Sequence, residues 1–153
     1  GGGRIIGEAC HYIDLCTFIS GSMVKAVCMN SIGPNPKENT DNASILLKYE
    51  NGTNAVINYF SNGNKAYSKE RIEVYNQEKT LIIDNWRTLQ AFGTKGFSKA
   101  KTRLNKGHGK QYELFIQSIK TGCPIIAFNE IENTTRASFA AIESLKTNQW
   151  VNI

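Results

Sequence analysis

The stretch ASILLKYENGTNAVINYF, residues 43–60, decides the fold class of this chain. It contains two runs of β-forming residues, 43–49 and 54–60, with Asn51-Gly52 between them. An Asn-Gly pair is a strong hairpin signal, because a two-residue type I′ turn needs positive φ at both central residues. We therefore predict an antiparallel hairpin with a type I′ turn at Asn51-Gly52.

Further runs on either side of this hairpin have the same β-type character. They span residues 24–31, 71–75, 80–84 and 88–92. Turn residues separate the runs, among them Gly33-Pro34, Asn62-Gly63 and Asn76-Gln77-Glu78. Consecutive short strands joined by turns predict a mostly antiparallel sheet of six strands.

Helical spacing of apolar residues appears at both ends of the chain. The predicted helices span 5–20, 112–119 and about 130–147, and Gly21 and Gly122 follow the first two. The order helix, six strands, two helices predicts an α+β fold, in which an open, mostly antiparallel β-sheet has helices packed on one face. A length of 153 residues suits one domain, 1–153.

Two of the predicted strands are apolar on both faces. Ile45, Leu46 and Leu47 are consecutive, and so are Leu81, Ile82 and Ile83. Since the helices cover only one side of the sheet, the other face should pack against another subunit. We expect a homo-oligomer, a two-fold dimer, formed through the sheet face.

Composition argues against several classes of protein. Hydrophobic residues make up 41% and charged residues 20% of the chain, and no apolar run approaches the roughly 18 residues of a membrane span. The chain shows no secretion signal, and its cysteines form neither C-x-x-C pairs nor a dense disulfide framework. We expect a cytoplasmic protein with reduced thiols, no metal ion and no membrane partner. The cysteines are Cys10, Cys16, Cys28 and Cys123.

A net charge of +5 raises nucleic-acid binding as an alternative. Residues 95–110 contain six lysines and arginines and no acidic residue. The run has one aromatic residue, Phe97, and no recognition-helix pattern, so a solvated loop is favoured and no nucleic-acid partner is expected.

His11 is the candidate catalytic residue on the first predicted helix. On a helical wheel, Gly7, His11, Asp14 and Phe18 form a narrow strip outside the apolar arc. A histidine on a rigid helix can remove a proton from a substrate hydroxyl, while Asp14 fixes its tautomer or tunes its basicity. Spacing by itself favours the alternative, in which His11 bonds to a carbonyl and Asp14 is a solvated helix residue.

Residues 1–15, GGGRIIGEACHYIDL, resemble a segment of the Gfo/Idh/MocA family of NAD(P)-dependent sugar and inositol dehydrogenases. The segment is the helix that opens the main part of the family's C-terminal domain, with a glycine triplet followed by a histidine and Ile-Asp. The resemblance continues in order through nearly the whole chain, at residues 41–49, 51–52, 68–71, 121–122 and 140–145. It implies an open sheet with helices on one side, used for binding a sugar-like substrate and for oligomer contacts.

The resemblance also implies NAD or NADP, bound mainly by a preceding Rossmann domain. That domain is absent from this chain, which has no G-x-G-x-x-G after a strand. The family's active-site histidine maps onto His11. Many members carry an aspartate four residues earlier, where this chain has Gly7, so Glu8 or Asp14 would be the acid partner, with Glu8 slightly ahead. Lys69 and Arg71 are weaker candidates for substrate contact.

These inferences favour a substrate-binding and dimerisation domain of an oxidoreductase that acts on a sugar, nucleotide sugar or cyclitol by hydride transfer. The isolated fragment should be inactive and should bind no cofactor of its own. The alternative is a non-catalytic dimerisation or ligand-binding module in which His11 has no chemical role.

Overall fold

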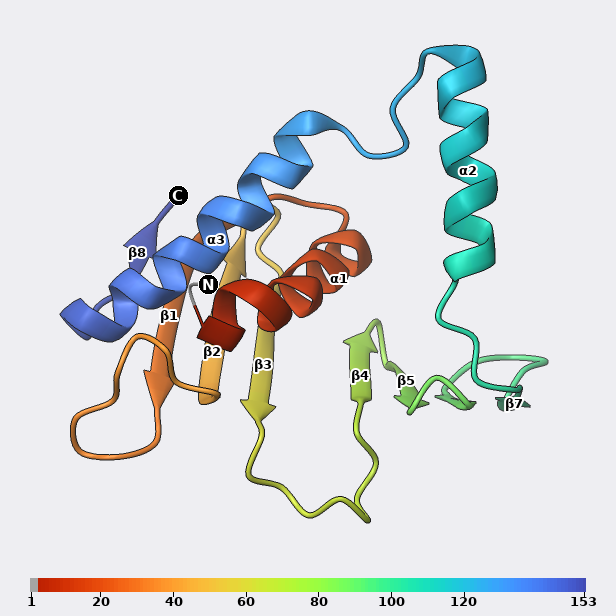
Figure 1. Cartoon of the computed structure of the whole chain (residues 1–153). Coiled ribbons are helices and arrows are strands. Elements are labelled where there is room, and N and C mark those ends of the chain that lie inside the picture. Colours follow the sequence, from red (N-terminus) through yellow and green to blue (C-terminus); the bar gives the residue numbers. More distant parts are fainter. Residues whose placement is uncertain (1–2) are drawn as a thin grey trace. The chain divides into compact units, whose positions relative to one another are not determined.

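The structure of the chain, a computed structural model, describes residues 3–153 (Figure 1). Gly1 and Gly2, which belong to the glycine triplet of the family resemblance, lie outside the described residues. The chain forms two compact units, residues 1–62 with 126–153, and residues 63–125. Each unit contains a four-stranded sheet, and every strand pair in both sheets is antiparallel. The predicted α+β class with antiparallel strands is confirmed. The single sheet of six strands is wrong, because the predicted strands before residue 62 and those after it belong to different sheets.

The first unit is built on a sheet with the strand order β3-β2-β1-β8. Its strands are β1 (Val24–Ser31), β2 (Asn42–Tyr49), β3 (Asn54–Phe60) and β8 (Val151–Asn152). The first three confirm the predicted strands to within one residue. Strand β8 was not predicted, because two residues are too few to show a period.

The β2–β3 hairpin is confirmed, but the predicted type I′ turn is wrong. Of the loop residues only Gly52 has a positive φ, 86°, and its N–H bonds to the Tyr49 carbonyl at 3.1 Å. The loop is therefore a type I turn followed by a left-handed glycine, which needs three residues. Asn51 favours this form, because its Nδ2 donates to the Ser20 carbonyl at 3.0 Å and ties the turn to the end of the first helix.

The first helix begins with a π-helical turn, η1 (Ile5–Ala9), and continues as α1 (Cys10–Ser20). The Cys10 N–H bonds to the carbonyl of Ile5, five residues earlier. The predicted extent 5–20 is confirmed, whereas a uniform α-helical period is wrong before residue 10. Gly21 ends α1 with a left-handed φ of 61°, as predicted.

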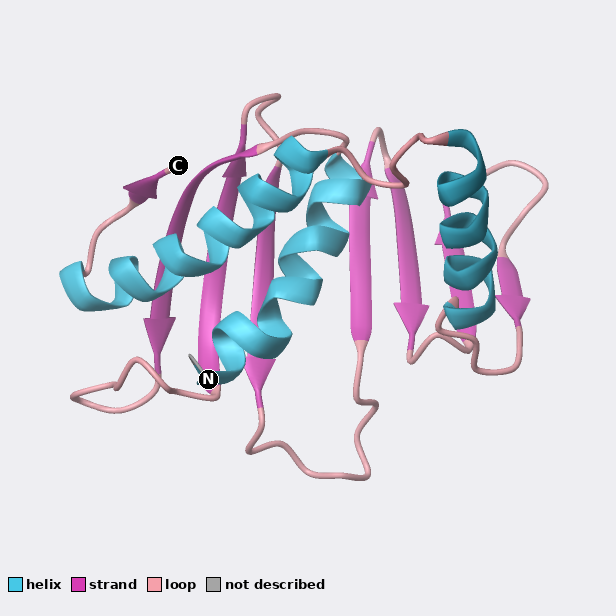
Figure 2. Cartoon of the chain, turned by 45° about the horizontal axis from the view of Figure 1, so that its top comes forward, coloured by secondary structure: helices cyan, strands magenta, loops and turns pink. Residues whose placement is uncertain are grey.

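Helices α1 and α3 (Phe128–Thr147) lie side by side on one face of β1, β2 and β3 (Figure 2). The core between these layers is apolar. Ile5 and Ile13 of the first helix and Ile45 and Leu47 of β2 are at most 1% exposed. Burying four such side chains stabilises this unit by roughly 1.5–3 kcal/mol each, before entropy is counted.

Two polar side chains of α3 also bond to the backbone of β1. Asn133 accepts from the Val24 N–H at 2.8 Å and donates to the Val24 carbonyl at 2.9 Å. Ser144 accepts from the Met29 N–H at 2.9 Å. These bonds satisfy buried backbone groups that a sheet partner would otherwise pair, so α3 is held to β1 at two points.

The opposite face of the first sheet is apolar in part and exposed. Leu46 and Val56 are register partners, and their exposed fractions are 41% and 58%. Phe60 on β3 is 44% exposed. The prediction that Leu46 faces away from Ile45 and Leu47 is confirmed, and the dimer expected to cover this face stays a prediction.

The second unit has the sheet order β4-β5-β6-β7. It contains the strands β4 (Arg71–Asn76), β5 (Lys79–Asp84), β6 (Thr88–Phe92) and β7 (Lys99–Lys101), and the helix α2 (His108–Thr121). The predicted strands and the helix around 112–119 are confirmed. The prediction of a solvated loop over 95–110 is wrong at two segments. Strand β7 and the first residues of α2 lie within this range. Exposed lysines suit an edge strand, where they oppose further pairing.

The α2 side chains all remain at least partly exposed, including Tyr112 at 72% and Ile119 at 63%. Gly122 ends this helix in the left-handed conformation, as predicted. Of the helices that the structure describes, none has the length and apolar character needed to cross a membrane.

Glu70 anchors the second unit at the start of β4. Its side chain is 8% exposed; Lys106 Nζ lies 2.8 Å from one carboxylate oxygen, and the Trp86 indole N–H donates to the other. Burial favours the neutral acid, but the bonds from Lys106 and Trp86 outweigh it and hold the pKa of Glu70 below its ordinary value. Glu70 thus ties the β5–β6 turn and the segment before α2 to one point.

Gly93→Ala should destabilise the second unit more than Gly96→Ala. Both glycines have left-handed φ, 73° and 77°, so both changes carry the left-handed cost of roughly 1–2 kcal/mol. A Cβ at Gly93 would also lie 2.5 Å from the Glu78 carbonyl oxygen, whereas Gly96 faces open space. Urea unfolding of the two variants measures the difference, and equal losses would contradict the close approach.

Glu70→Gln should lower the free energy of unfolding by about 1–3 kcal/mol at pH 7, as expected for a charged hydrogen bond. Because the folded pKa lies below the unfolded value of about 4.3, this stability is present above that pH and is lost as the pH falls through the folded pKa. The difference from wild type should therefore shrink in acid. Glu113→Gln is the control, because the Lys110–Glu113 pair is exposed and contributes little.

Candidate functional site

His11 lies in the first turn of α1, on the side that faces away from the core. Ala9 and Ile13, on the inner side, are fully buried. Gly7, His11, Asp14 and Phe18 are all exposed, Phe18 by 83%. The outward strip predicted from the helical wheel is confirmed, and the catalytic role of its residues stays a prediction. An exposed imidazole on a well-packed helix can exchange protons with a bound molecule.

Gly7 leaves open space one turn before His11. A Cβ built on Gly7 would have no neighbour within 4 Å, so a larger side chain would fit there. With glycine in place, that space is available to a substrate that approaches the imidazole.

Glu8 is an exposed residue of η1 that bonds to the sheet. Its Oε2 accepts a hydrogen bond from the Tyr59 hydroxyl on β3. Arg4, the residue before η1, lies close enough to Tyr59 and Glu8 for both to raise the pKa of its guanidinium. The structure therefore brings Arg4 and Tyr59 together with Glu8, which lies three residues before His11.

The Tyr59 phenol is held as a hydrogen-bond donor. Burial raises its pKa, the bond to Glu8 raises it further, and Arg4 opposes the shift. The bond to Tyr59 and the charge of Glu8 in turn raise the pKa of Arg4. At neutral pH the phenol is therefore protonated and the guanidinium charged.

Arg4 and Tyr59 were missed by reasoning from the sequence. Tyr59 lies 51 residues from Glu8, and no local pattern joins them. One signal was available, because Tyr59 shares a strand face with Ile57, which is 7% exposed in the core under the helices. Tyr59 is the last residue on that face of β3, so its long side chain can reach the edge of the first helix.

The other predicted site residues lie in different units. Asp14 is exposed on α1 in the first unit. Lys69 is exposed just before β4 in the second unit. Arg71 begins β4, and its Nε lies 2.7 Å from Glu73 Oε1. An arginine already held by a carboxylate is less available to a substrate than a solvated one.

The cysteines near His11 do not act as thiolates. Burial raises the pKa of the Cys10 thiol and raises that of Cys16 to about 11, so both stay protonated at neutral pH. Among residues 3–153, no group of three or more His, Cys, Asp or Glu side chains is placed to hold a metal ion.

The described residues do not form a dinucleotide-binding unit. Such a unit places the pyrophosphate between parallel strands and a helix N-terminus, and every strand pair that the structure describes is antiparallel. These residues therefore do not fit NAD or NADP as its main binding site.

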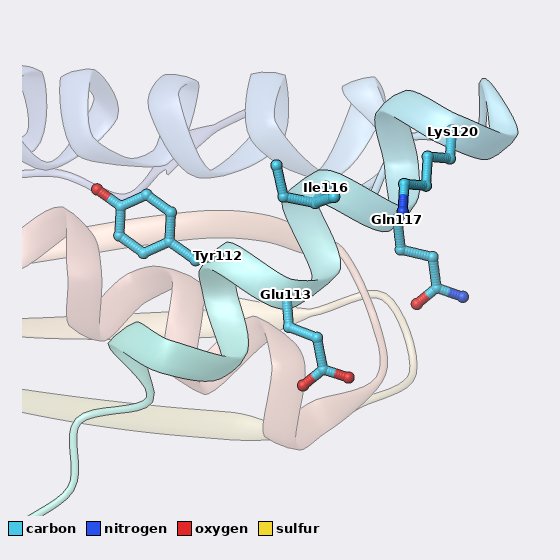
Figure 3. Close-up of a pocket in the computed structure, with 5 residues that line it drawn as sticks. All are labelled: Tyr112, Glu113, Ile116, Gln117 and Lys120. Atoms are coloured by element: carbon cyan, nitrogen blue, oxygen red, sulfur yellow. The ribbon is translucent and has the colours of Figure 1, made fainter.

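Two hollows on the surface of the described residues do not have His11 in their lining. One of about 460 Å³ runs along α2 and is lined by Tyr112, Glu113, Ile116, Gln117 and Lys120 (Figure 3). All its residues come from one helix, so it is an open surface. The other, of about 400 Å³, borders the β2–β3 turn, where Lys48 Nζ lies 4.3 Å from the Trp150 ring centroid.

Comparison with solved structures shows the same fold in dehydrogenases. The chain aligns over 95% of its length with 49% of a levoglucosan dehydrogenase in complex with NADH and levoglucosan, at 18% identity and a TM-score of 0.77. It aligns over 99% with 50% of an oxidoreductase from Agrobacterium radiobacter in complex with NAD+, L-tartaric acid and magnesium, at 19% identity and a TM-score of 0.75. The chain spans about half the length of the solved structures it matches.

A UDP-N-acetylglucosamine 3-dehydrogenase from Acidithiobacillus ferrooxidans aligns with 90% of the chain over 46% of its own length, at 17% identity and a TM-score of 0.69. No curated protein sequence matches the chain. Residues 1–82, more than half of the chain, match the family described as GFO/IDH/MocA C-terminal domain. The chain therefore belongs to the GFO/IDH/MocA C-terminal domain family.

Proposed function

We propose that this chain is the substrate-side half of an NAD(P)-dependent oxidoreductase that acts on a sugar, nucleotide sugar or cyclitol. Family membership and the half-length match to dehydrogenases support this assignment. The observation that carries it is the exposed His11 on a helix whose opposite face is buried. This geometry holds a proton acceptor rigidly at the surface, where a substrate and a second domain can reach it.

In the proposed reaction, His11 accepts the proton of a substrate hydroxyl while the hydride leaves the same carbon. Glu8 and Asp14, three residues before and after His11, are the candidate carboxylates that stabilise the resulting imidazolium. Lys69 and Arg71 are weaker candidates for contact with the substrate. The hydride acceptor is the nicotinamide of a cofactor held by a domain outside this chain.

The apolar face formed by Leu46, Val56 and Phe60 supports a second role in this proposal, dimerisation. These residues are 41–58% exposed on the face of the first sheet opposite the helices. An exposed apolar sheet face of this kind is typical of a protein–protein contact, and a two-fold axis lets one such face cover another copy of itself.

His11→Ala should lower the turnover of the full-length oxidoreductase by several orders of magnitude. Loss of a general acid or base lowers kcat by about 10²–10⁴. NAD(P)H absorbance with a panel of sugars and cyclitols measures the effect, and circular dichroism checks that the fold is kept. The 153-residue chain by itself should show no turnover.

His108→Ala is the matched control for that experiment, because His108 lies at the start of α2 in the second unit. It should leave kcat near the wild-type value. Equal turnover of the His11→Ala variant and the wild type would favour the non-catalytic module instead.

Val56→Lys should convert a dimer of the chain, about twice 17.0 kDa, into a monomer. A charge placed in the apolar face loses its hydration when the face is covered, whereas it stays solvated in a monomer. Light scattering at micromolar concentration measures the mass. Phe18→Lys changes an apolar residue that is even more exposed but lies outside this face, and it should leave the dimer intact. A monomeric wild type would rule out this interface.

A further inference from the structure

Two asparagines of this chain are followed directly by glycine, Asn51 and Asn62. An asparagine in this context can modify itself, because the nitrogen of the glycine attacks the side-chain carbonyl carbon with no Cβ in the way. The bond from that carbon to the side-chain nitrogen breaks, and the amide leaves as ammonia together with the proton of the glycine N–H. Water then opens the resulting succinimide ring, which gives aspartate or isoaspartate. The reaction needs only water, so the local structure decides where it occurs.

The attack requires two groups that can move. The asparagine side chain has to rotate until its carbonyl carbon meets the next nitrogen in the main chain, and that N–H has to leave any acceptor it donates to. Each hydrogen bond that holds one of these groups slows the reaction by about two- to tenfold, because the bond has to open first. The two Asn-Gly pairs differ in the number of such bonds.

Asn51 and Gly52 are held at each reacting group. Nδ2 of Asn51 donates to the Ser20 carbonyl at 3.0 Å, and Oδ1 accepts from the Thr53 N–H at 3.0 Å. The Gly52 N–H donates to the Tyr49 carbonyl at 3.1 Å. These bonds fix both the side chain and the attacking nitrogen, so the turn between β2 and β3 protects its asparagine.

Asn62 and Gly63 lie where the hydrogen bonds of the first unit end. The Ser61 N–H donates to the Asp41 carbonyl and the Asn62 N–H donates to Asn42 Oδ1, both at 3.1 Å. Beyond that nitrogen, neither the Asn62 side chain nor the Gly63 N–H has a hydrogen-bond partner within the part of the chain that the structure describes. Both residues are exposed, so the reacting groups are free to meet.

The Asn62-Gly63 peptide bond is also a joint between the two units, since one unit includes residue 62 and the other begins at residue 63. Residues 61–70 form no helix or strand, so a rotation at Asn62 breaks no strand pairing. Either product adds a carboxylate and lowers the net charge from +5 to +4. Isoaspartate also adds one carbon atom to the main chain at this joint.

We propose that Asn62 is a site of spontaneous deamidation, at which the chain converts the asparagine of the joint into aspartate and isoaspartate. The fold protects the other Asn-Gly pair, Asn51-Gly52, from the same reaction. The inference does not depend on the proposed oxidoreductase function.

The test follows both asparagines of the 153-residue chain in a single peptide. Trypsin cleaves after Lys48 and Lys65, so the peptide 49–65 carries both Asn-Gly pairs. The folded chain is incubated at mildly alkaline pH in ¹⁸O-labelled water and then digested in ordinary water. Tandem mass spectrometry assigns the label to residue 51 or 62. Asn62 should react at least about tenfold faster than Asn51, because the hydrogen bonds around Asn51 have to open first.

The same incubation in concentrated urea is the control for local sequence. Unfolding removes the hydrogen bonds of Asn51, so the two asparagines should then react at nearly equal rates. Gly63→Ala is the matched variant. It should slow the reaction at Asn62 several-fold, because the added Cβ hinders the attack, and it should leave the rate at Asn51 unchanged.

Equal rates at the two asparagines of the folded chain, a faster reaction at Asn51, or no label at residue 62 would overturn the inference. A preference for Asn62 that persists in urea would overturn it as well, because the difference would then come from neighbouring side chains and not from the fold. A preference that is present in the folded chain and lost in urea supports it.

Discussion

The burial of one face of the first helix is the constraint on which the rest of the first unit depends. Ile5, Ala9 and Ile13 are completely inaccessible to solvent, and they share a core with Ile45 and Leu47 of β2. A helix fixed on one side can present its opposite side in only one way. The exposure of His11, the gap at Gly7 and the reach of Glu8 to Tyr59 all follow from this orientation.

Polar side chains complete the fold where the sheets lack partners. In the first unit, Asn133 and Ser144 of α3 bond to the backbone of β1, and α3 cannot slide along the strand without breaking these bonds. In the second unit, Glu70 gathers Lys106 and Trp86 around one buried carboxylate. In each arrangement, losing the charged or polar side chain would leave its buried partners without a hydrogen bond. This cost favours one local geometry over its alternatives.

The strand topology explains why the proposed enzyme would bind its substrate and its cofactor in different domains. Antiparallel sheets leave a face open for a partner, whereas dinucleotide sites are built at the ends of parallel strands. The described residues contain only antiparallel pairs, together with an outward histidine and carboxylates. In the proposed function, a chain of this kind would bind and deprotonate the substrate, and a second domain would supply the redox step.

The amino-acid sequence by itself determined the features that depend on neighbours in the chain. Alternation and turn residues placed six strands to within about one residue, glycines marked the ends of two helices, and the period of the first helix set His11 outward. Backbone sterics and the pleat act over a few residues, so a local pattern is sufficient for them.

Only the tertiary structure decided the features that join distant segments. The three-residue β2–β3 loop depends on the bond from Asn51 to Ser20, and the two short edge strands exist only because a neighbour pairs with them. The π-helical turn displaces the period of the first helix before residue 10, and the hydrogen bond from Tyr59 to Glu8 joins residues 51 apart in the sequence. Such contacts form after the core has packed, and no local propensity encodes them.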